Sequence, residues 1–372
     1  MNASKITGNE WWCLNKLNLT PGDLVIGNTY QSLGILRNFK TSVNKNFQGE
    51  VKDLTKIIYD GKELALSRLK DELKEVGAYG ATDMSVSVIH TPGTNNIEFL
   101  ATASAFHDKS GKTISEPMVM STDGQELWCM MDSGYTPKDF AMGTCIYSLG
   151  VVGGVMSGLR ALGKGEVKEL SDVFNKTRHI ALNRLIEEAR NEGYHAILSI
   201  KTSLTPYMGF EEMEMVGTFV TSEAPLSSDP NEIITSDLTA EELWNITSLG
   251  YSPVSLVLST SVYSMGKIGQ WSAAFKSFKK GEISEYTEVI YNARENAIQN
   301  LKKQAEECGA DDVIGLDLRF YHLSGGMFEV LALGTAVRKN PNVKTKTEIL
   351  PAQAIIRDKQ TFYNNCGIQL SE

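Results

Sequence analysis

The sequence has no excess of basic residues and few of the side chains that bind soft metals. Its 372 residues include 36 Lys and Arg against 45 Asp and Glu, which gives a formal net charge of −9. Phosphate backbones require a basic surface, so this charge argues against a nucleic-acid partner, although a cation could still bind. Only five histidines and five cysteines are present, and no two cysteines form a CxxC pair. The spacing of a zinc cluster is therefore missing.

The sequence also lacks an export signal. Its N-terminus, MNASKITGNEWW, has no basic stretch followed by an apolar run, so we expect a cytoplasmic location with reduced thiols. Residues 140–159 carry no charged side chain, but this stretch includes five glycines. We expect a buried strand and a loop there rather than a membrane span.

What the sequence does contain is a threefold internal repeat with a period of 116 residues. Five columns of identical residues recur at this interval, and this predicts a tandem triplication. The columns are Trp12/Trp128/Trp244, Pro21/Pro137/Pro253, Gly34/Gly150/Gly266, Gly49/Gly165/Gly281 and Gly77/Gly193/Gly309. We place repeat 1 at residues 1–118, repeat 2 at 119–234 and repeat 3 at 235–350, with a C-terminal tail at 351–372.

Each repeat has the pattern of one long amphipathic helix among strands. In repeat 3, apolar residues from Ile283 to Cys308 recur at steps of three and four, and Gly309 marks the helix end. One strand precedes this helix and two follow it. A right-handed crossover and the apolar character of the final strand predict the sheet order 1-3-2. We therefore predict an α+β chain of three two-layer β-α-β-β units, each preceded by a short Trp-containing helix that starts with a capping box.

Three columns are candidates for structural or interface roles. They are Glu50, Glu166 and Glu282 in the first, Lys62, Arg178 and Arg294 in the second, and Trp12, Trp128 and Trp244 in the third. The glutamates are predicted to start the long helix, where a carboxylate suits the helix dipole. The basic residues lie about three turns along that helix, where both an interface salt bridge and a solvated face remain open. The tryptophans are expected to anchor the short helices, with ligand stacking as the alternative.

The long helix and its flanking strands resemble a known family. Ala293-Arg294 in mid-helix, the stop at Gly309-Ala310-Asp311 and the closing Gly334-Thr335-Ala336 are similar to the YbjQ-like family, which carries a heavy-metal-binding label. The resemblance covers about residues 20–106, 135–221 and 251–338. It implies a fold like that of a dodecin subunit. It also implies assembly, because single-domain members are similar to pentameric ring formers.

Neither a metal site nor a catalytic set repeats among the copies. His90 and His322 share a column, but repeat 2 has Pro206 there. The remaining metal candidates are Asp311, Asp312 and Asp317 in repeat 3, for which a solvated loop is the competing interpretation. A serine column at Ser32, Ser148 and Ser264 has no histidine column beside it, so a nucleophile would have no evident base. We therefore expect no cofactor, with a metal ion left open.

These observations predict a non-enzymatic, ring-forming protein that acts as a scaffold or binds a small ligand or cation between repeats. The alternative is an enzyme with its site at one repeat junction. The expected partner is the chain itself. A homopentamer of three stacked rings, with one repeat in each layer, is the favoured arrangement. The alternative is a closed assembly with a symmetry other than fivefold.

Overall fold

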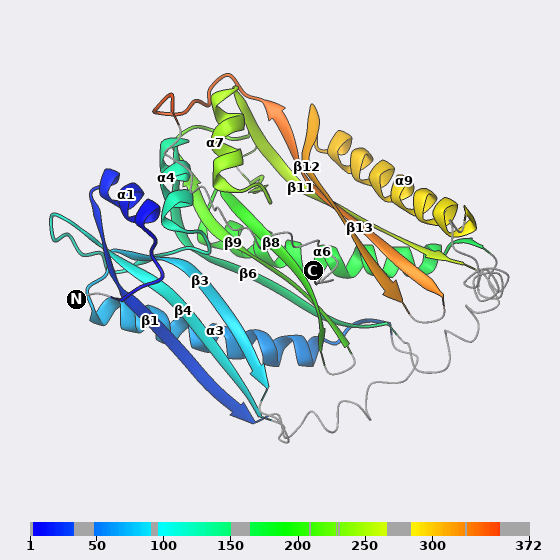
Figure 1. Ribbon diagram of the computed structural model, residues 1–372, viewed down its shortest axis with the longest axis horizontal. Helices are drawn as coiled ribbons and strands as arrows, with labels where there is room; N and C mark the ends of the chain where they lie inside the picture. The colour runs from blue at the N-terminus through cyan, green and yellow to red at the C-terminus, as the bar shows by residue number, and fades with distance from the viewer. Residues whose placement is uncertain are drawn as a thin grey trace, which may run out of the picture.

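The computed structural model describes residues 3–32, 48–90, 96–149, 164–207, 210–227, 229, 231–265, 284–323 and 326–349. These residues form six helices and thirteen strands, which confirms the α+β class. Their arrangement in three repeat-like units can be followed in Figure 1. Repeat 1 comprises α1 (Gly8–Lys16), β1 (Leu19–Ser32), β2 (Gln48–Glu50), α3 (Lys52–Glu75), β3 (Gly80–His90) and β4 (Asn96–Asp108). The predictions for Glu282, most of the variable loops and the tail fall outside these ranges.

Two short strands lead into the later repeats. After β5 (Met118–Val119), repeat 2 comprises α4 (Gly124–Asp132), β6 (Tyr135–Leu149), β7 (Gly165–Glu166), α6 (Lys168–Glu192), β8 (Ala196–Tyr207) and β9 (Phe210–Ser222). After β10 (Ile234–Thr235), repeat 3 comprises α7 (Ala240–Ser248), β11 (Tyr251–Ser264), α9 (Ser284–Glu307), β12 (Asp312–Leu323) and β13 (Met327–Lys339). None of the helices in the described part of the chain is long and apolar enough to cross a membrane.

Each repeat forms one sheet, and the neighbouring repeats add strands to it. The strand orders are β1-β4-β3-β5, β10-β8-β9-β6-β2 and β12-β13-β11-β7. The last long strand of each repeat is central and antiparallel to both neighbours. Strand β2 of repeat 1 pairs with β6 of repeat 2, and β7 of repeat 2 pairs with β11 of repeat 3. The repeats are therefore joined by backbone hydrogen bonds as well as by side chains.

The pairing of β2 and β7 with the next sheet corrects the predicted start of the long helix. Glu50 and Glu166 lie in β2 and β7, whereas the helices begin at Lys52 and Lys168. The preceding Gly49 and Gly165 adopt φ values of 119° and 137°, which only glycine adopts readily. The exposed edge of the next sheet offers unpaired backbone groups, and pairing with them takes the place of a first helical turn.

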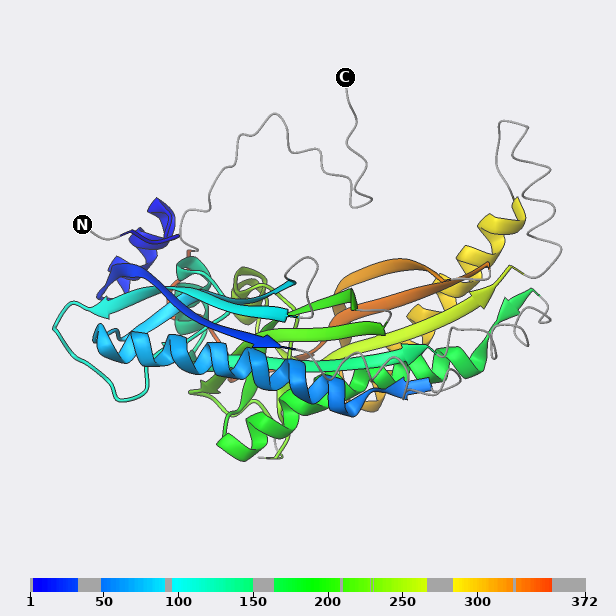
Figure 2. The same ribbon diagram turned by 90° about the horizontal axis from the view of Figure 1, so that it is seen from below.

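The long helices α3 and α6 each pack against two sheets. Figure 2 shows α3 and α6 running along one side of the strands. Leu54, Ile58 and Leu69 of α3 are buried in one apolar cluster that contains Val25 of repeat 1 and Met142 of repeat 2. Helix α6 packs in the same way on β6 and on β11 of repeat 3. Each of these two helices therefore covers its own sheet and the opposite face of the next sheet.

The short helices form a row of their own. Helix α1 contacts α4, and α4 contacts α7, at one end of the molecule (Figure 1). Each begins with a complete capping box, as the sequence predicted, at Thr7, Asp123 and Thr239. The row follows the same order as the sheets, so the three repeats are side by side throughout.

Candidate functional site: the junctions between repeats

The first junction is built on a buried lysine. Lys62 of α3 is 1% exposed, and its Nζ donates hydrogen bonds to Glu212 Oε1 at 2.7 Å and Glu214 Oε1 at 2.6 Å, both in β9 of repeat 2. Thr144 Oγ1 also donates to Glu212 Oε1, at 2.9 Å. Burial opposes the charge of Lys62, but the carboxylates of Glu214 and Glu212 outweigh it and raise the lysine pKa. The ammonium group therefore remains charged inside the junction.

The second junction repeats this arrangement with arginine. Arg178 of α6 is fully buried, and its Nη2 donates to Glu329 Oε1 of β13 at 2.6 Å. Its Nη1 donates to Tyr147 Oη at 2.5 Å, while Thr260 Oγ1 donates to the same Glu329 oxygen at 3.2 Å. The guanidinium also lies over the Phe174 ring, 5.2 Å from its centroid. Lys62 and Arg178 therefore form salt bridges between repeats of one chain, and the salt bridge across a subunit interface stays a prediction.

The third member of the column lies in the last of the three described repeats. Arg294 of α9 is 39% exposed, and its Nη2 lies 3.3 Å from Glu295 Oε1 on the same helix. Its guanidinium stacks on Tyr291, 4.8 Å from the ring centroid. The solvated-face interpretation therefore describes Arg294 in the single chain.

The glutamates Glu50 and Glu166 lie at the same junctions. Arg184 of α6 donates from Nη2 to Glu50 Oε1 at 2.5 Å, and from Nη1 to the carbonyl oxygen of Thr144. This salt bridge links repeat 1 to repeat 2. Glu166 lies opposite Tyr263 of repeat 3 in the strand ladder, and its side chain is exposed.

The tryptophan column differs along the row of short helices. Trp128 and Trp244 are 8% and 5% exposed, and Trp244 Nε1 donates to Asp132 Oδ2 of the preceding helix at 2.7 Å. Trp12, in contrast, is 49% exposed. Trp12 is therefore not buried as Trp128 and Trp244 are, because α4 is the one described short helix that α1 contacts and it does not cover Trp12.

A glutamate in each of the first two short helices serves two helix ends. Glu10 Oε2 accepts from the backbone N–H of Gly124 at 3.3 Å, and Glu126 Oε1 accepts from Ala240 at 3.4 Å. Each glutamate also closes the capping box of its own helix. A carboxylate at a helix N-terminus is favoured by the helix dipole, so α1 stabilises α4 and α4 stabilises α7.

Raising the pH from about 5 to about 8 is expected to weaken the folded chain through Glu126. Burial and then the charge of Asp123 raise the Glu126 pKa from 4.5 to about 7. Because the folded state holds this proton more tightly, the stabilisation is present below pH 4.5 and is lost as the pH rises through 7. The loss should be on the order of 1–3 kcal/mol in denaturant unfolding. Burial, and then the charges of Glu63 and Asp139, raise the Glu188 pKa to about 7. Ionisation of Glu188 therefore also lowers the stability of the folded chain as the pH rises.

The Glu126→Gln variant tests this assignment. It should remove roughly half of the pH dependence, whereas Glu166→Gln, an exposed control, should leave it unchanged. An unaltered pH dependence in Glu126→Gln would rule out this source.

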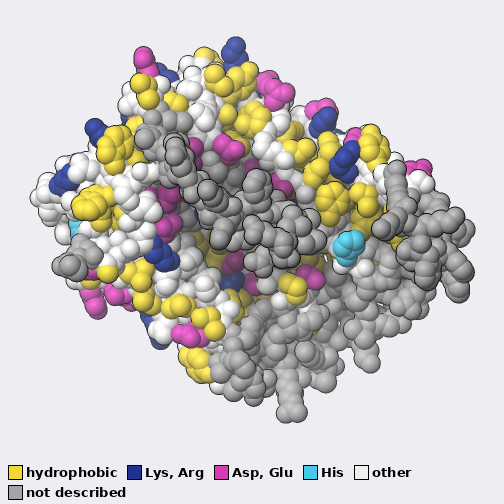
Figure 3. All heavy atoms as spheres, in the orientation of Figure 1, with side chains coloured by type: hydrophobic (Ala, Val, Ile, Leu, Met, Phe, Trp, Pro, Cys, Tyr) yellow, Lys and Arg dark blue, Asp and Glu magenta, His cyan; other side chains and the backbone are white. Residues whose placement is uncertain are grey.

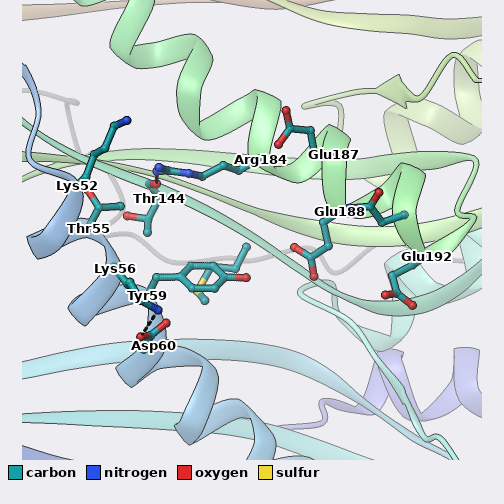
Figure 4. A pocket seen from close by; sticks show the side chains of 12 residues that line it. Lys52, Thr55, Lys56, Tyr59, Asp60, Thr144, Arg184, Glu187, Glu188 and Glu192 are labelled. Carbon is teal, nitrogen blue, oxygen red and sulfur yellow. Dashed lines mark hydrogen bonds and ion pairs between the residues drawn. The ribbon is translucent and has the colours of Figure 1, made fainter.

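A polar groove of about 490 Å³ lies beside the first junction. Figure 4 shows Tyr59 of α3 and Arg184, Glu187 and Glu188 of α6 facing into it, with Lys56 and Asp60 paired at its side. The raised pKa of Glu188 means that this carboxyl changes charge near neutral pH. The described lining has no cysteine or histidine.

The three candidate metal ligands in repeat 3 do not converge. Asp311 Oδ2 accepts from the Lys339 N–H at 2.8 Å, and Asp317 Oδ2 pairs with Arg319 Nε at 2.7 Å. Asp312 is an exposed residue in β12. Within the described ranges, no group of three or more His, Cys, Asp or Glu residues is placed to hold a metal ion.

The cysteines that share a column are also poor metal ligands. Cys13 and Cys129 are buried in the apolar cluster around Trp128 and Trp244. Burial, followed by the charges of Asp123 and Glu10, raises the Cys13 pKa to about 12. Soft metals bind thiolate, so these residues do not fit a heavy-metal site.

The sequence pattern missed the acidic partners at the junctions. Glu212 and Glu329 occupy matching positions, opposite Ile146 and Val262 of the first strand, and Glu98 opposite Tyr30 is the repeat-1 member. These glutamates are 114 and 117 residues apart because the last hairpins differ in length. A comparison at a fixed interval of 116 therefore did not align them, whereas one that allowed gaps in the hairpin would have done so.

Comparison with known proteins matches all three units. The family described as "Putative heavy-metal-binding", which is YbjQ-like, matches residues 20–106, 135–223 and 249–340. An "Encapsulin nanocompartment protein" of Mycobacterium tuberculosis is 26% identical over 230 residues, which are 60% of this chain and 86% of that protein. A "UPF0145 protein" of Thermotoga maritima is 45% identical over 67 residues, which are 18% of this chain and 63% of that protein. Another, of Pseudothermotoga lettingae, is 39% identical over 85 residues, 23% of this chain and 80% of that protein.

Proposed function

The chain belongs to the YbjQ-like family, three copies of whose domain it carries in tandem, and on this premise we propose that it is a non-enzymatic protein that assembles with itself. The observation that carries the proposal is the repeated junction. The long helix of one repeat covers the next sheet and places a buried cation on its central strand, at Lys62 and at Arg178. A chain of three repeats makes this contact twice and presents one unused half of it at each end.

The comparisons support a role in assembly. One relative is named as an encapsulin nanocompartment protein, and the others are UPF0145 proteins. Four cysteines in the described part of the chain are free, which supports the cytoplasm as the compartment.

The packing favours a single-layer assembly over three stacked rings of five. In a stack with one repeat per layer, each repeat would use its junction surfaces on other chains. Here those surfaces join repeats 1, 2 and 3 of the same chain. A closed ring of such chains contains a multiple of three repeats, so we propose a closed count other than five repeats.

A second candidate function is the binding of a small polar ligand or a cation in the groove between α3 and α6. It is favoured by the mixed charges of the lining and by Glu188, whose pKa is raised to about 7. An enzymatic site at this junction is the weaker alternative, because the described lining has carboxyl groups but no histidine or cysteine. We assign no cofactor to the groove.

Native mass spectrometry of the purified chain tests the proposal. We expect a main species whose mass is a whole multiple of 40.9 kDa, at least twice that value, and which persists on dilution to about micromolar concentration. The same spectrum shows any ligand that the assembly retains. A single chain at every concentration would overturn the assembly role.

A further inference from the structure

Resting on the proposed assembly role, we propose that two copies join by the same junction that joins the repeats. Helix α9 of one copy sits on the open face of the repeat-1 sheet of the next, and Arg294 pairs there with Glu98. The contact is head to tail, so another copy of the chain covers α9 at one end and the repeat-1 sheet at the other.

One face of the repeat-1 sheet carries exposed apolar side chains that no described helix covers. Ile26 and Tyr30 on β1 are 47% and 57% exposed. Their counterparts in repeat 2, Met142 and Ile146, are buried beneath α3. In repeat 3, Leu258 and Val262 at the same positions are buried in the cluster that contains Phe174 of α6. In Figure 3, hydrophobic and acidic side chains are both visible over the repeat-1 end.

Helix α9 presents the matching half of the junction. Ile290 is 38% exposed, whereas its counterparts Ile58 in α3 and Phe174 in α6 are fully buried against the next sheet. A residue of the same apolar type at the same position, exposed only in the last repeat, indicates that the covering sheet belongs to another chain.

The charges at the two ends are complementary and already oriented. In each junction a residue of the first strand holds the acceptor carboxylate, Thr144 for Glu212 and Thr260 for Glu329. In repeat 1, Asn28 Nδ2 donates to Glu98 Oε1 at 3.4 Å in the same way. The carboxylate of Glu98 at one end and the guanidinium of Arg294 at the other are therefore the two halves of a third pair.

The row of short helices independently supports a head-to-tail contact between copies. The N-termini of α4 and α7, at Gly124 and Ala240, are buried and capped by the glutamate of the preceding helix. Gly8, which begins α1, and Glu242 of α7 are exposed. A copy joined tail to head would place Glu242 at the start of the next α1. It would also cover the exposed Trp12.

Charge reversal at the two ends tests the contact. Arg294→Glu and Glu98→Arg should each weaken association at least about tenfold, measured by native mass spectrometry over a dilution series. The double variant should restore assembly, because every junction then joins opposite charges. A one-to-one mixture of the single variants should restore rings with an even number of chains, in which the two variants alternate. Lys303→Glu, the same charge change on an exposed part of α9, should leave association unchanged.

The outcomes separate this inference from the proposed function. If the unmodified chain is a single chain at every concentration, the proposed function fails. If it assembles but neither reversal weakens it, or if the double variant does not restore it, the Arg294–Glu98 junction is wrong while the assembly role stands. Circular dichroism of each variant checks that the chain remains folded.

Discussion

Replacing Arg178 by alanine is expected to lower the free energy of unfolding by about 3–5 kcal/mol. The guanidinium is fully buried and bonds to Glu329 and Tyr147. Its removal leaves the Glu329 carboxylate, 2% exposed, without its cation, and a buried unpaired charge is costly. Urea unfolding, followed by far-ultraviolet circular dichroism, measures the difference.

Two variants distinguish the charge from the side-chain volume. Arg294→Ala removes the same side chain from an exposed position of α9, so in the dissociated chain it should cost less than about 1 kcal/mol. Arg178→Met combined with Glu329→Leu removes both charges and should recover most of the lost stability. If Arg178→Ala costs no more than Arg294→Ala, the buried pair does not hold the junction as described.

Replacing Gly143 by alanine is expected to cost about 2–3 kcal/mol. A β-carbon at this position would overlap the carbonyl oxygen of Ala181 and would crowd Leu185, both in α6. A helix backbone cannot turn aside as a flexible side chain can, so the helix must move away from the sheet. The loss should appear as a lower urea midpoint with an unchanged slope.

Repeat 3 provides the control for this effect. Ser259 occupies the column of Gly143 and is already buried with a side chain, so α9 tolerates a β-carbon there. Ser259→Ala should therefore change the unfolding free energy by less than about 1 kcal/mol. Equal costs for Gly143→Ala and Ser259→Ala would contradict the close approach of helix and sheet in repeat 2.

The elements inside each repeat could be predicted because their signals are local. The spacing of apolar residues marks the long helices, and the capping boxes mark the starts of the short ones. The left-handed ends fall at Gly77, Gly193 and Gly309, with φ values of 63°, 75° and 70°. Such features depend on a few neighbouring residues, so one sequence with three copies is sufficient to find them.

The pairing of β2 and β7 with the sheet of the next repeat could not be predicted, because its signal is not local. Strand β2 has three residues, and its partner in β6 lies about a hundred residues away. The Gly-Glu pair at its end is equally typical of a helix start. The pairing is decided by the edge of a neighbouring sheet, which no pattern within the segment records.

The candidate site was predicted in part. The basic column was found, but the pattern did not show what lies opposite each of its three members. Lys62 and Arg178 face a following repeat, whereas Arg294 lies at the last one. The same holds for the tryptophans, since Trp12 has the sequence of an anchor and no helix over it. Whether such a residue is buried depends on which repeat it lies in. The residue type at that position does not reveal this.

Images of the purified particle by electron microscopy test the central claim most directly. That claim is that one junction, repeated within the chain, also closes chains into an assembly. We expect closed rings one layer thick, in which chains follow one another head to tail and the repeat junctions look alike within and between chains. Three stacked layers, or single separate chains, would contradict it.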